Sequence, residues 1–308
     1  MTSRVLVIRL GALGDLVLSS GPFRAIREHH RDARITLLTT KPYESLARAG
    51  GWFDEVWLDD KPRWWQVSVL RDLSRRLKSG AFDRVYDLQT SDRSCGYFRL
   101  FGRPRPEWSG IARGCSHPQA NPDRDRMHTV ERQADQLAMA GITDVPPPDL
   151  SMVRADLSTF DLPDRFVMLV SGSAPHRPDK RWPVDRYGDL CERLRGSGLT
   201  PVVIGGPAER EIGRRLSETQ RGIVDLVGQT SFEQIAMLAQ KAAVAVGNDT
   251  GPMHIAATAG CPSVVLFSQA SDPLLTAPRG RLVKVLQRDR LEDLSADEVA
   301  HVMNGVLA

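Results

Sequence analysis

Short apolar runs alternate with amphipathic stretches through the first half of the chain. We predict strands over 4–10, 35–39, 55–58 and 84–88. Apolar residues at helical spacing follow the first run and recur over 66–79. Uninterrupted apolar runs are typical of parallel strands buried on both faces, and their alternation with helices indicates a parallel sheet between two helical layers.

The segment Asp144-Val-Pro-Pro-Pro148 interrupts this pattern, because three consecutive prolines cannot continue a helix and favour a stiff, extended connector. The alternation then starts again. We expect strands over 166–170, 201–204, 243–246 and 263–267, and helices near 183–196 and over 291–307. The prediction is an α/β protein of two doubly wound domains, 1–148 and 149–308. Packing of the last helix back on the N-terminal domain is one option.

Composition and length are those of an ordinary globular protein. The 308 residues exceed what one core usually fills, and 41% of them are hydrophobic. No apolar run approaches the roughly 18 residues that a membrane span needs. Arg9 and Asp15 lie inside the apolar N-terminal stretch, which argues against a signal peptide. Four scattered cysteines suit reduced thiols, so we expect a cytoplasmic protein.

The net charge of +3 conceals an uneven distribution. Residues 61–132 contain 15 Lys and Arg against 8 Asp and Glu, mostly through arginine, which favours recognition of carboxylates and phosphates. A solvated surface explains the charge equally well, and without a recognisable module we expect no nucleic-acid partner. Within this segment, Arg63-Trp64-Trp65 is expected to pack in the core, with a lipid headgroup region as the alternative.

The loop Gly11-Ala-Leu-Gly14-Asp15 follows the first predicted strand. Ligands of open parallel sheets bind outside the carboxyl ends of strands, and Gly11 and Gly14 allow a tight turn close to a ligand. Asp15 falls near the start of the next helix, where it either caps that helix or acts on a substrate. The spacing is not the GxGxxG of dinucleotide sites, and no acidic residue ends the second strand, so NAD is disfavoured.

The loops of the second half favour a nucleotide diphosphate. In Gly247–His254, Pro252 suits the first turn of a helix, and Asp249 or Thr250 its cap. Such a helix start binds anions, and His254 adds a donor unless it is structural. Lys180 either reaches the same anion or is surface charge. Glu209, after another strand, is placed to accept hydrogen bonds from a ribose.

Other chemistries find no support. Cys115 and His117 lack two further ligands at metal spacing, so we expect no metal. The chain contains neither a GxSxG elbow nor a GxxxxGK[ST] phosphate loop.

Three motifs together resemble the heptosyltransferases of glycosyltransferase family 9, in order and across nearly the whole chain. They are Val5-Leu-Val-Ile-Arg-Leu-Gly-Ala-Leu-Gly-Asp15, Asp179-Lys-Arg-Trp-Pro183 and Gly247-Asn-Asp-Thr-Gly-Pro-Met-His254. The resemblance implies a GT-B fold, in which two Rossmann-like domains face a central cleft. It also implies an ADP-L-glycero-β-D-manno-heptose donor, a lipopolysaccharide inner-core acceptor, and inversion at the anomeric carbon without a metal.

The resemblance assigns roles to matching residues. It implies that Asp15 is the general base, that Lys180 contacts the diphosphate and that Glu209 contacts the ribose. Residues that hold the sugar and phosphates would be Asp249, Thr250, Gly251 and His254.

Two segments depart from the family pattern. Ala174–Pro178 replaces hydroxyl residues that precede the lysine in some members, and Ser171 or Ser173 would substitute for them. Ser268–Asp272 stands where Gly-Pro-Thr-Asp is common.

The expected partners are a nucleotide-sugar donor and an anionic glycolipid acceptor, with transient contact at the inner face of the inner membrane. The basic 61–132 segment would then lie in the acceptor-binding domain and 149–308 would bind the donor. A glycosyltransferase with another donor or a protein acceptor stays open. So does a non-catalytic nucleotide-sugar binding protein.

Overall fold

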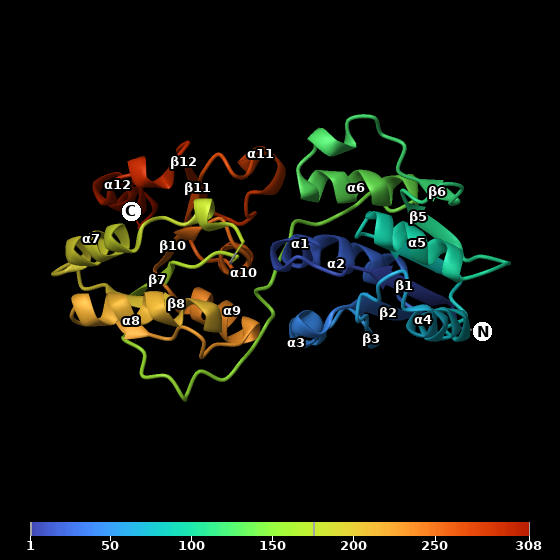
Figure 1. Ribbon diagram of the computed structural model, residues 1–308, viewed down its shortest axis with the longest axis horizontal. Coiled ribbons are helices and arrows are strands. Elements are labelled where there is room, and N and C mark those ends of the chain that lie inside the picture. Colours follow the sequence, from blue (N-terminus) through green and yellow to red (C-terminus); the bar gives the residue numbers. More distant parts are fainter. Residues whose placement is uncertain (1, 175, 308) are drawn as a thin grey trace. The chain divides into compact units, whose positions relative to one another are not determined.

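The computed structural model describes residues 2–174 and 176–307. It divides into two compact units, Met1–Pro148 and Asp149–Ala308, so the division falls at the end of the proline run (Figure 1). Each unit contains a six-stranded sheet whose neighbouring strands are all parallel. The predicted class, two doubly wound α/β domains, is confirmed.

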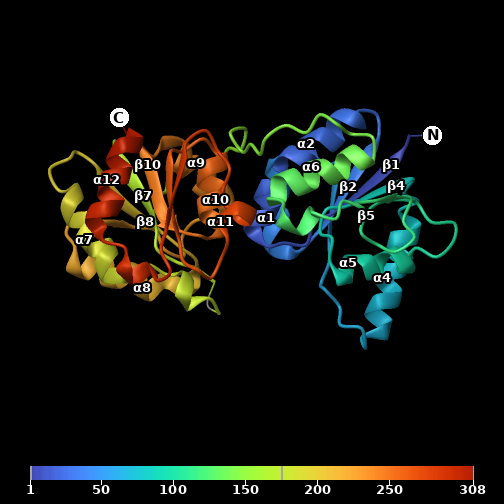
Figure 2. The ribbon, with the colours of Figure 1, turned by 90° about the horizontal axis from the view of Figure 1, so that it is seen from above.

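The sheet of the first unit has the strand order β3-β2-β1-β4-β5-β6. Its strands are β1 (Arg4–Ile8), β2 (Arg34–Thr39), β3 (Glu55–Leu58), β4 (Arg84–Asp87), β5 (Glu107–Gly110) and β6 (His117–Pro118). Its helices are α1 (Leu13–Leu18), α2 (Ser20–His29), α3 (Glu44–Ala49), α4 (Val67–Ser79), α5 (Asp92–Leu100) and α6 (Thr129–Met139). Figure 2 shows α2 and α6 on one face of this sheet and α4 and α5 on the other.

The second unit repeats the arrangement with the order β12-β11-β10-β7-β8-β9. Its strands are β7 (Phe166–Val170), β8 (Thr200–Ile204), β9 (Val224–Asp225), β10 (Val244–Asn248), β11 (Ser263–Phe267) and β12 (Val283–Gln287). Its helices are α7 (Val184–Leu194), α8 (Arg210–Thr219), α9 (Phe232–Lys241), α10 (Gly251–Thr258), α11 (Pro273–Thr276) and α12 (Ala296–Leu307).

In both sheets the strand order reverses at one point. The chain adds β2 and β3 on one side of β1 and then places β4 on the other side of β1. In the second sheet it adds β8 and β9 on one side of β7 and then places β10 on the other. The carboxyl ends of strands at such a switch point leave a crevice between the loops that follow them. The fold therefore directs attention to the loops after β1 and β4, and to those after β7 and β10.

The last helix belongs to the core of the second unit. Val299, Met303 and Val306 of α12 are buried in one cluster with residues of α7, β10 and β11. The last helix thus packs within its own unit, and the option that it also contacts the N-terminal domain stays a prediction.

The expectation that Trp64 and Trp65 pack in the core is wrong. Trp64 is 81% exposed and Trp65 is 55% exposed, on the segment that leads into α4. Among the described residues, no helix combines the length and apolar character needed to cross a bilayer.

Candidate active site

Asp15 lies at the switch point of the first sheet, in the third position of α1. Its Oδ1 is 3.1 Å from Nη2 of Arg9, which is almost fully buried at the end of β1. Its Oδ2 accepts a hydrogen bond of 3.2 Å from the amide of Ala12. The carboxylate thus caps the helix start and forms an ion pair, yet 37% of the side chain stays exposed. The capping and functional readings of Asp15 are therefore compatible.

The loop before Asp15 needs its first glycine. Gly11 has a φ of +122°, in the region that favours glycine. A β-carbon there would come within 2.7 Å of the Tyr43 ring. Burial and the charge of Asp15 raise the pKa of Tyr43, so its hydroxyl stays protonated beside the carboxylate. Gly14, the second predicted glycine, lies within α1 next to Asp15.

Arg9 connects Asp15 with a second carboxylate. It donates to the carbonyl of Leu88 through Nη1. The charge of Arg9 also acts on Asp87, the buried last residue of β4, although burial raises the pKa of Asp87 to about 6. Burial lowers the pKa of Arg9 itself, while Asp15 and Asp87 oppose that effect. A buried cation between two carboxylates fixes the position of the exposed one.

Further cations lie near this pair. Burial and the charges of Arg124 and Arg9 lower the pKa of Arg132 in α6, and Asp15 opposes them. Arg124 is held by Gln119, whose Oε1 accepts from its Nε at 3.2 Å. The surroundings of Asp15 are therefore suited to an anionic ligand.

In the second unit, a carboxylate is the centre of a polar cluster. Oδ2 of Asp249, which follows β10, lies 2.6 Å from Nζ of Lys180 and accepts from the Ser271 hydroxyl at 2.7 Å. Nε2 of His254 is 3.9 Å from Oδ1 of the same residue. All three contacts converge on a side chain that is 7% exposed. The structure thus brings Lys180 to Asp249 and His254, which lie about 70 residues further along the chain, and adds Ser271.

Thr250 and Gly251 form the start of α10 as the sequence predicted. Thr250 is the extended N-cap residue, and Gly251 is the first residue of the helix. Pro252 has no N–H, and the amide of Met253 donates to the Thr250 carbonyl at 3.0 Å. The amide of Gly251 is therefore the first-turn donor best placed for an anion.

Asn248, which sequence reasoning missed, joins this loop to the others. Its Oδ1 accepts from the amide of Trp182 at 2.9 Å and from the Tyr187 hydroxyl at 3.1 Å. Its Nδ2 donates to the carbonyls of Ser171 at 2.8 Å and Gly172 at 3.2 Å. One buried amide therefore fixes the loops after β7 and β10 and the approach to α7.

The two serines after β7 are both buried, but in different surroundings. The hydroxyl of Ser173 donates to the carbonyl of Arg177 at 3.0 Å and accepts from Nε of Arg181 at 3.1 Å. Ser171 is 2% exposed, and its hydroxyl has no hydrogen-bond partner within the described residues. Of the two serines, Ser171 is therefore the one whose hydroxyl hydrogen is not already used in a hydrogen bond among the described residues.

Glu209 lies against the glycines of two neighbouring loops. A β-carbon on Gly172 would come within 2.2 Å of its carboxyl carbon, and its Oε2 accepts from the amide of Gly206. The carboxylate therefore stands at the ends of β7 and β8, close to the Ser171 loop.

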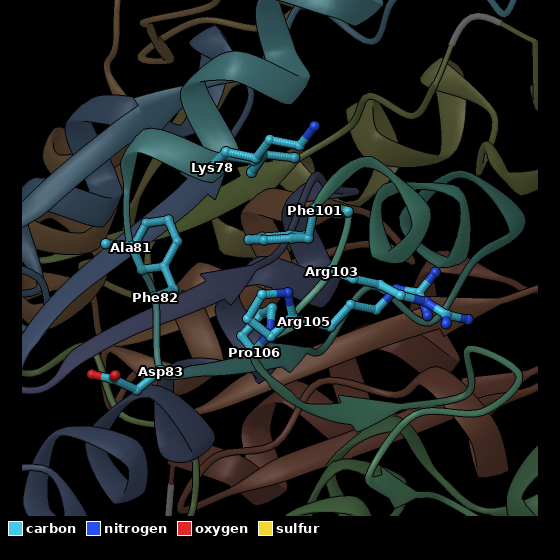
Figure 3. Close-up of a pocket in the computed structure, with 11 residues that line it drawn as sticks. Lys78, Ala81, Phe82, Asp83, Phe101, Arg103, Arg105 and Pro106 are labelled. Carbon is cyan, nitrogen blue, oxygen red and sulfur yellow. The ribbon is translucent and has the colours of Figure 1, made fainter.

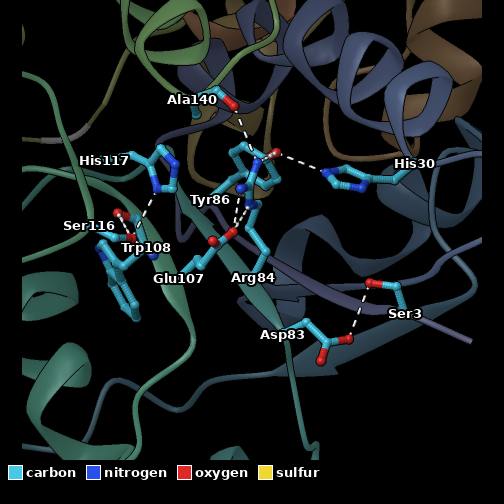
Figure 4. A network of polar contacts seen from close by, with 10 residues as sticks. All are labelled: Ser3, His30, Asp83, Arg84, Tyr86, Glu107, Trp108, Ser116, His117 and Ala140. Carbon is cyan, nitrogen blue, oxygen red and sulfur yellow. Dashed lines mark hydrogen bonds and ion pairs between the residues drawn. The ribbon is translucent and has the colours of Figure 1, made fainter. Parts of the chain in front are cut away.

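The amino ends of the strands of the first sheet have other polar features. A cavity of about 530 Å³ opens before β4 and β5, and Figure 3 shows Lys78, Arg103 and Arg105 around it. Nearby, the network of Figure 4 joins the Tyr86 hydroxyl to Nε2 of His30 at 2.8 Å, and burial lowers the pKa of His30 to about 4. Both lie at the amino ends of the strands, away from Asp15.

Two parallel six-stranded sheets with helices, each with polar loops at its switch point, are the architecture of the GT-B fold, which solved heptosyltransferases share. The family model of glycosyltransferase family 9 (heptosyltransferase) matches residues 70–301, and the chain belongs to this family. It is therefore a glycosyltransferase family enzyme.

Curated relatives and solved structures that resemble this chain are heptosyltransferases as well. Lipopolysaccharide heptosyltransferase 2 of Salmonella typhimurium is 26% identical over 310 residues, covering 92% of this chain and 88% of the relative. The structure of E. coli ADP-heptose lps heptosyltransferase II has a TM-score of 0.82 at 23% identity and covers 99% of this chain and 98% of its own. E. coli heptosyltransferase WaaC with ADP has a TM-score of 0.81 at 20% identity, with coverages of 98% and 99%.

Proposed function

We propose that the protein transfers a heptose from ADP-L-glycero-β-D-manno-heptose to an inner-core sugar of lipopolysaccharide, with inversion at the anomeric carbon. Family membership and the lipopolysaccharide heptosyltransferases among its relatives support this reaction. The observation that carries it is the half-exposed carboxylate of Asp15, held by the buried Arg9 at the switch point of the first sheet.

In this proposal the first unit binds the acceptor. A hydroxyl oxygen of the acceptor attacks the anomeric carbon while Asp15 takes its proton. The C–O bond to the diphosphate breaks on the opposite face, and the ADP leaves with the bonding electrons. Arg124 and Arg132, at the end of the basic 61–132 segment, would attract the anionic groups of an inner-core glycolipid.

The second unit binds the donor in this proposal. ADP bound to one family member and the polar cluster around Asp249 support it. Lys180, His254 and the amide of Gly251 would contact the diphosphate, where negative charge grows as the bond breaks. Ser171, Ser173, Asp249 and Thr250 would hold the phosphates and sugar. The carboxylate of Glu209 would accept hydrogen bonds from the ribose hydroxyls.

The test of the base is Asp15→Asn, which keeps the size of the side chain but removes its basicity. We expect kcat to fall by at least about 100-fold with little change in donor affinity, measured by ADP release and by calorimetric titration of ADP. Asp32→Asn is the matched control, because Asp32 is an exposed carboxylate just before β2, at the other edge of the sheet.

Activity of Asp15→Asn close to that of the wild type would overturn the assignment and leave Asp15 as a helix cap. Donor turnover assayed with and without the lipid-linked acceptor sugar separates a transferase from a protein that only binds nucleotide sugars. Transfer to a protein in place of the glycolipid would overturn the proposed acceptor.

A further inference from the structure

The chain between β3 and α4 carries large apolar side chains on the surface. Residues 63–69 are all exposed, and they include Trp64 at 81%, Trp65 at 55%, Val67 at 51% and Val69 at 37% exposure. We call residues 61–71 the tryptophan segment. Four large exposed apolar side chains thus lie within six residues, and clustered exposed apolar side chains mark interaction sites more often than scattered ones do.

Hydrogen bonds and ring contacts organise the tryptophan segment. The two indole rings pack edge to face, 5.5 Å apart, and the Arg63 guanidinium lies 5.1 Å from the centroid of the Trp65 ring. Nη1 of Arg93 donates to the carbonyl of Pro62 at 2.8 Å, and the amide of Lys61 donates to Asp59 at 2.7 Å. Figure 2 shows the segment and the start of α4 projecting from the rest of the first unit. The patch is therefore a raised surface and not a groove.

The charge of the tryptophan segment has one sign. Lys61, Arg63 and Arg71 are exposed, and residues 61–71 contain no Asp or Glu. The acids that flank it are the exposed Asp60 on the N-terminal side and Asp72, which pairs with Arg75 in α4. Apolar anchors and cations therefore share one projecting surface.

We propose that the tryptophan segment docks the protein on the surface of an anionic phospholipid bilayer. Indole rings are favoured at the level of the headgroups, and clustered Lys and Arg are attracted to the negative surface potential of anionic lipids. Two weak signals together give stable but reversible attachment. A protein partner would need shape complementarity, whereas a bilayer accepts a raised patch and supplies negative charge around it.

This inference goes beyond the proposed reaction, because it concerns the surface on which the enzyme works. The first unit would carry both the docking segment and Asp15, so a lipid-linked acceptor and its base would be served by the same unit.

The test is co-sedimentation of the full-length protein with vesicles of phosphatidylcholine, with and without phosphatidylglycerol, and with no acceptor present. We expect binding to the anionic vesicles, a blue shift of tryptophan fluorescence on binding, and loss of binding as salt is raised. Weak binding to pure phosphatidylcholine is expected. Absence of binding to the anionic vesicles would overturn the proposal.

Two double variants separate the apolar and charged contributions. Trp64→Ala/Trp65→Ala is expected to lower partitioning into anionic vesicles at least about tenfold, since it removes both indole rings. Arg63→Glu/Arg71→Glu is expected to lower partitioning into anionic vesicles at least about 25-fold. Each basic residue near the membrane surface contributes about 1 kcal/mol of attraction, and the loss of two corresponds to that fold-change.

The controls place the same changes in the second unit. Leu274→Ala removes another apolar side chain, which is 79% exposed. Arg281→Glu/Lys284→Glu changes the net charge by the same amount as Arg63→Glu/Arg71→Glu. We expect both to bind vesicles as the wild type does. Equal losses in the tryptophan segment and in the controls would overturn the proposal in favour of a general charge effect.

A lipid-free, water-soluble acceptor gives a further readout. The tryptophan variants should keep the wild-type KM for it, which also shows that they are folded. A raised KM with unchanged vesicle binding would mean that the segment contacts the acceptor glycan and not the bilayer. Because the vesicle assay contains no substrate, its outcome is independent of whether the proposed reaction is correct.

Discussion

Arg9 shows how a single residue organises the site of the first unit. Its side chain is almost fully buried, and it lies among the Asp15 carboxylate, the Leu88 carbonyl and the charge of Asp87. A buried guanidinium is costly unless it is paired, so its two anionic neighbours and the carbonyl acceptor fix its position. The exposed carboxylate of Asp15 is held through that fixed group and not through its own burial.

Asp87 gives a pH dependence that can be measured at one residue. Its pKa is raised to about 6 by burial, above the ordinary value of an unfolded Asp, so the folded state holds the proton more tightly. This group therefore stabilises the fold at low pH, and its contribution falls as pH rises from about 4 to about 6. The difference corresponds to about 3 kcal/mol at most.

We expect Asp87→Asn to remove that dependence. The difference in unfolding free energy between variant and wild type should change in favour of the variant as pH rises from 4 to 6, and then stay level. Urea denaturation across this pH range measures it. The amide oxygen of Asn can still accept from the amides of Gln89 and Thr90, as Oδ1 of Asp87 does. A pH-independent difference would contradict the raised pKa.

Among the elements, those with a clear apolar run could be predicted from sequence. The central strands β1, β7, β10 and β11 are buried along almost their whole length, and their runs are unmistakable. Strands β6 and β9 have two residues each, and β12 at the sheet edge is largely exposed, so none shows a buried-strand pattern. Short pairings at an edge are decided by neighbouring strands and not by local sequence.

For the candidate site too, residues marked by a local sequence pattern could be predicted, and residues defined by contacts with distant parts of the chain could not. Asp249 and Thr250 lie directly after β10, and Asp15 lies in the first turn of the helix that follows β1, so the sequence order is enough to place them. Arg9 and Asn248 could not be assigned, because each is a polar residue at the end of a buried strand with hydrogen-bond partners in distant parts of the chain. The one signal for Arg9 was a charge within an apolar run.

At the scale of elements, we predict the effect of replacing Asn248. Replacing it with Ala removes the acceptor of the Trp182 amide and the donor to the Ser171 carbonyl, whereas the Tyr187 hydroxyl keeps the Val170 carbonyl as its acceptor. We expect Asn248→Ala to lower the unfolding free energy by about 2–4 kcal/mol, since each buried polar group left unpaired costs about 1–3 kcal/mol. ADP affinity should also fall. Chemical denaturation and calorimetric titration measure the two effects.

Asn304→Ala is the control for this variant, because Asn304 is exposed on α12. Its effect should stay within about 0.5 kcal/mol. If Asn248→Ala were equally mild, the loops after β7 and β10 would be held mainly by their own backbone contacts.

At the scale of the molecule, one architecture is used twice with different chemistry. The first switch point presents a carboxylate among arginines, and the second presents Lys180 and His254 around Asp249 at a helix start. Each unit likewise has a core cluster of its own, one built from residues of the second unit and one from residues of the first. Repetition of the fold therefore supplies two independent binding edges, which suits a reaction between two different substrates.

Separate cores predict separate thermal responses to a ligand of one unit. We expect calorimetry of the full chain to show two transitions, of which ADP raises only one. Saturation at 100 times Kd stabilises a binding unit by about 2.7 kcal/mol, which corresponds to a shift of about 5 to 10 °C for a unit of this size. Lys180→Ala should reduce the shift, whereas Asp15→Asn should preserve it, because the proposed function assigns Lys180 and not Asp15 to the donor site. Equal shifts of both transitions, or a shift lost in Asp15→Asn, would contradict donor binding by the second unit.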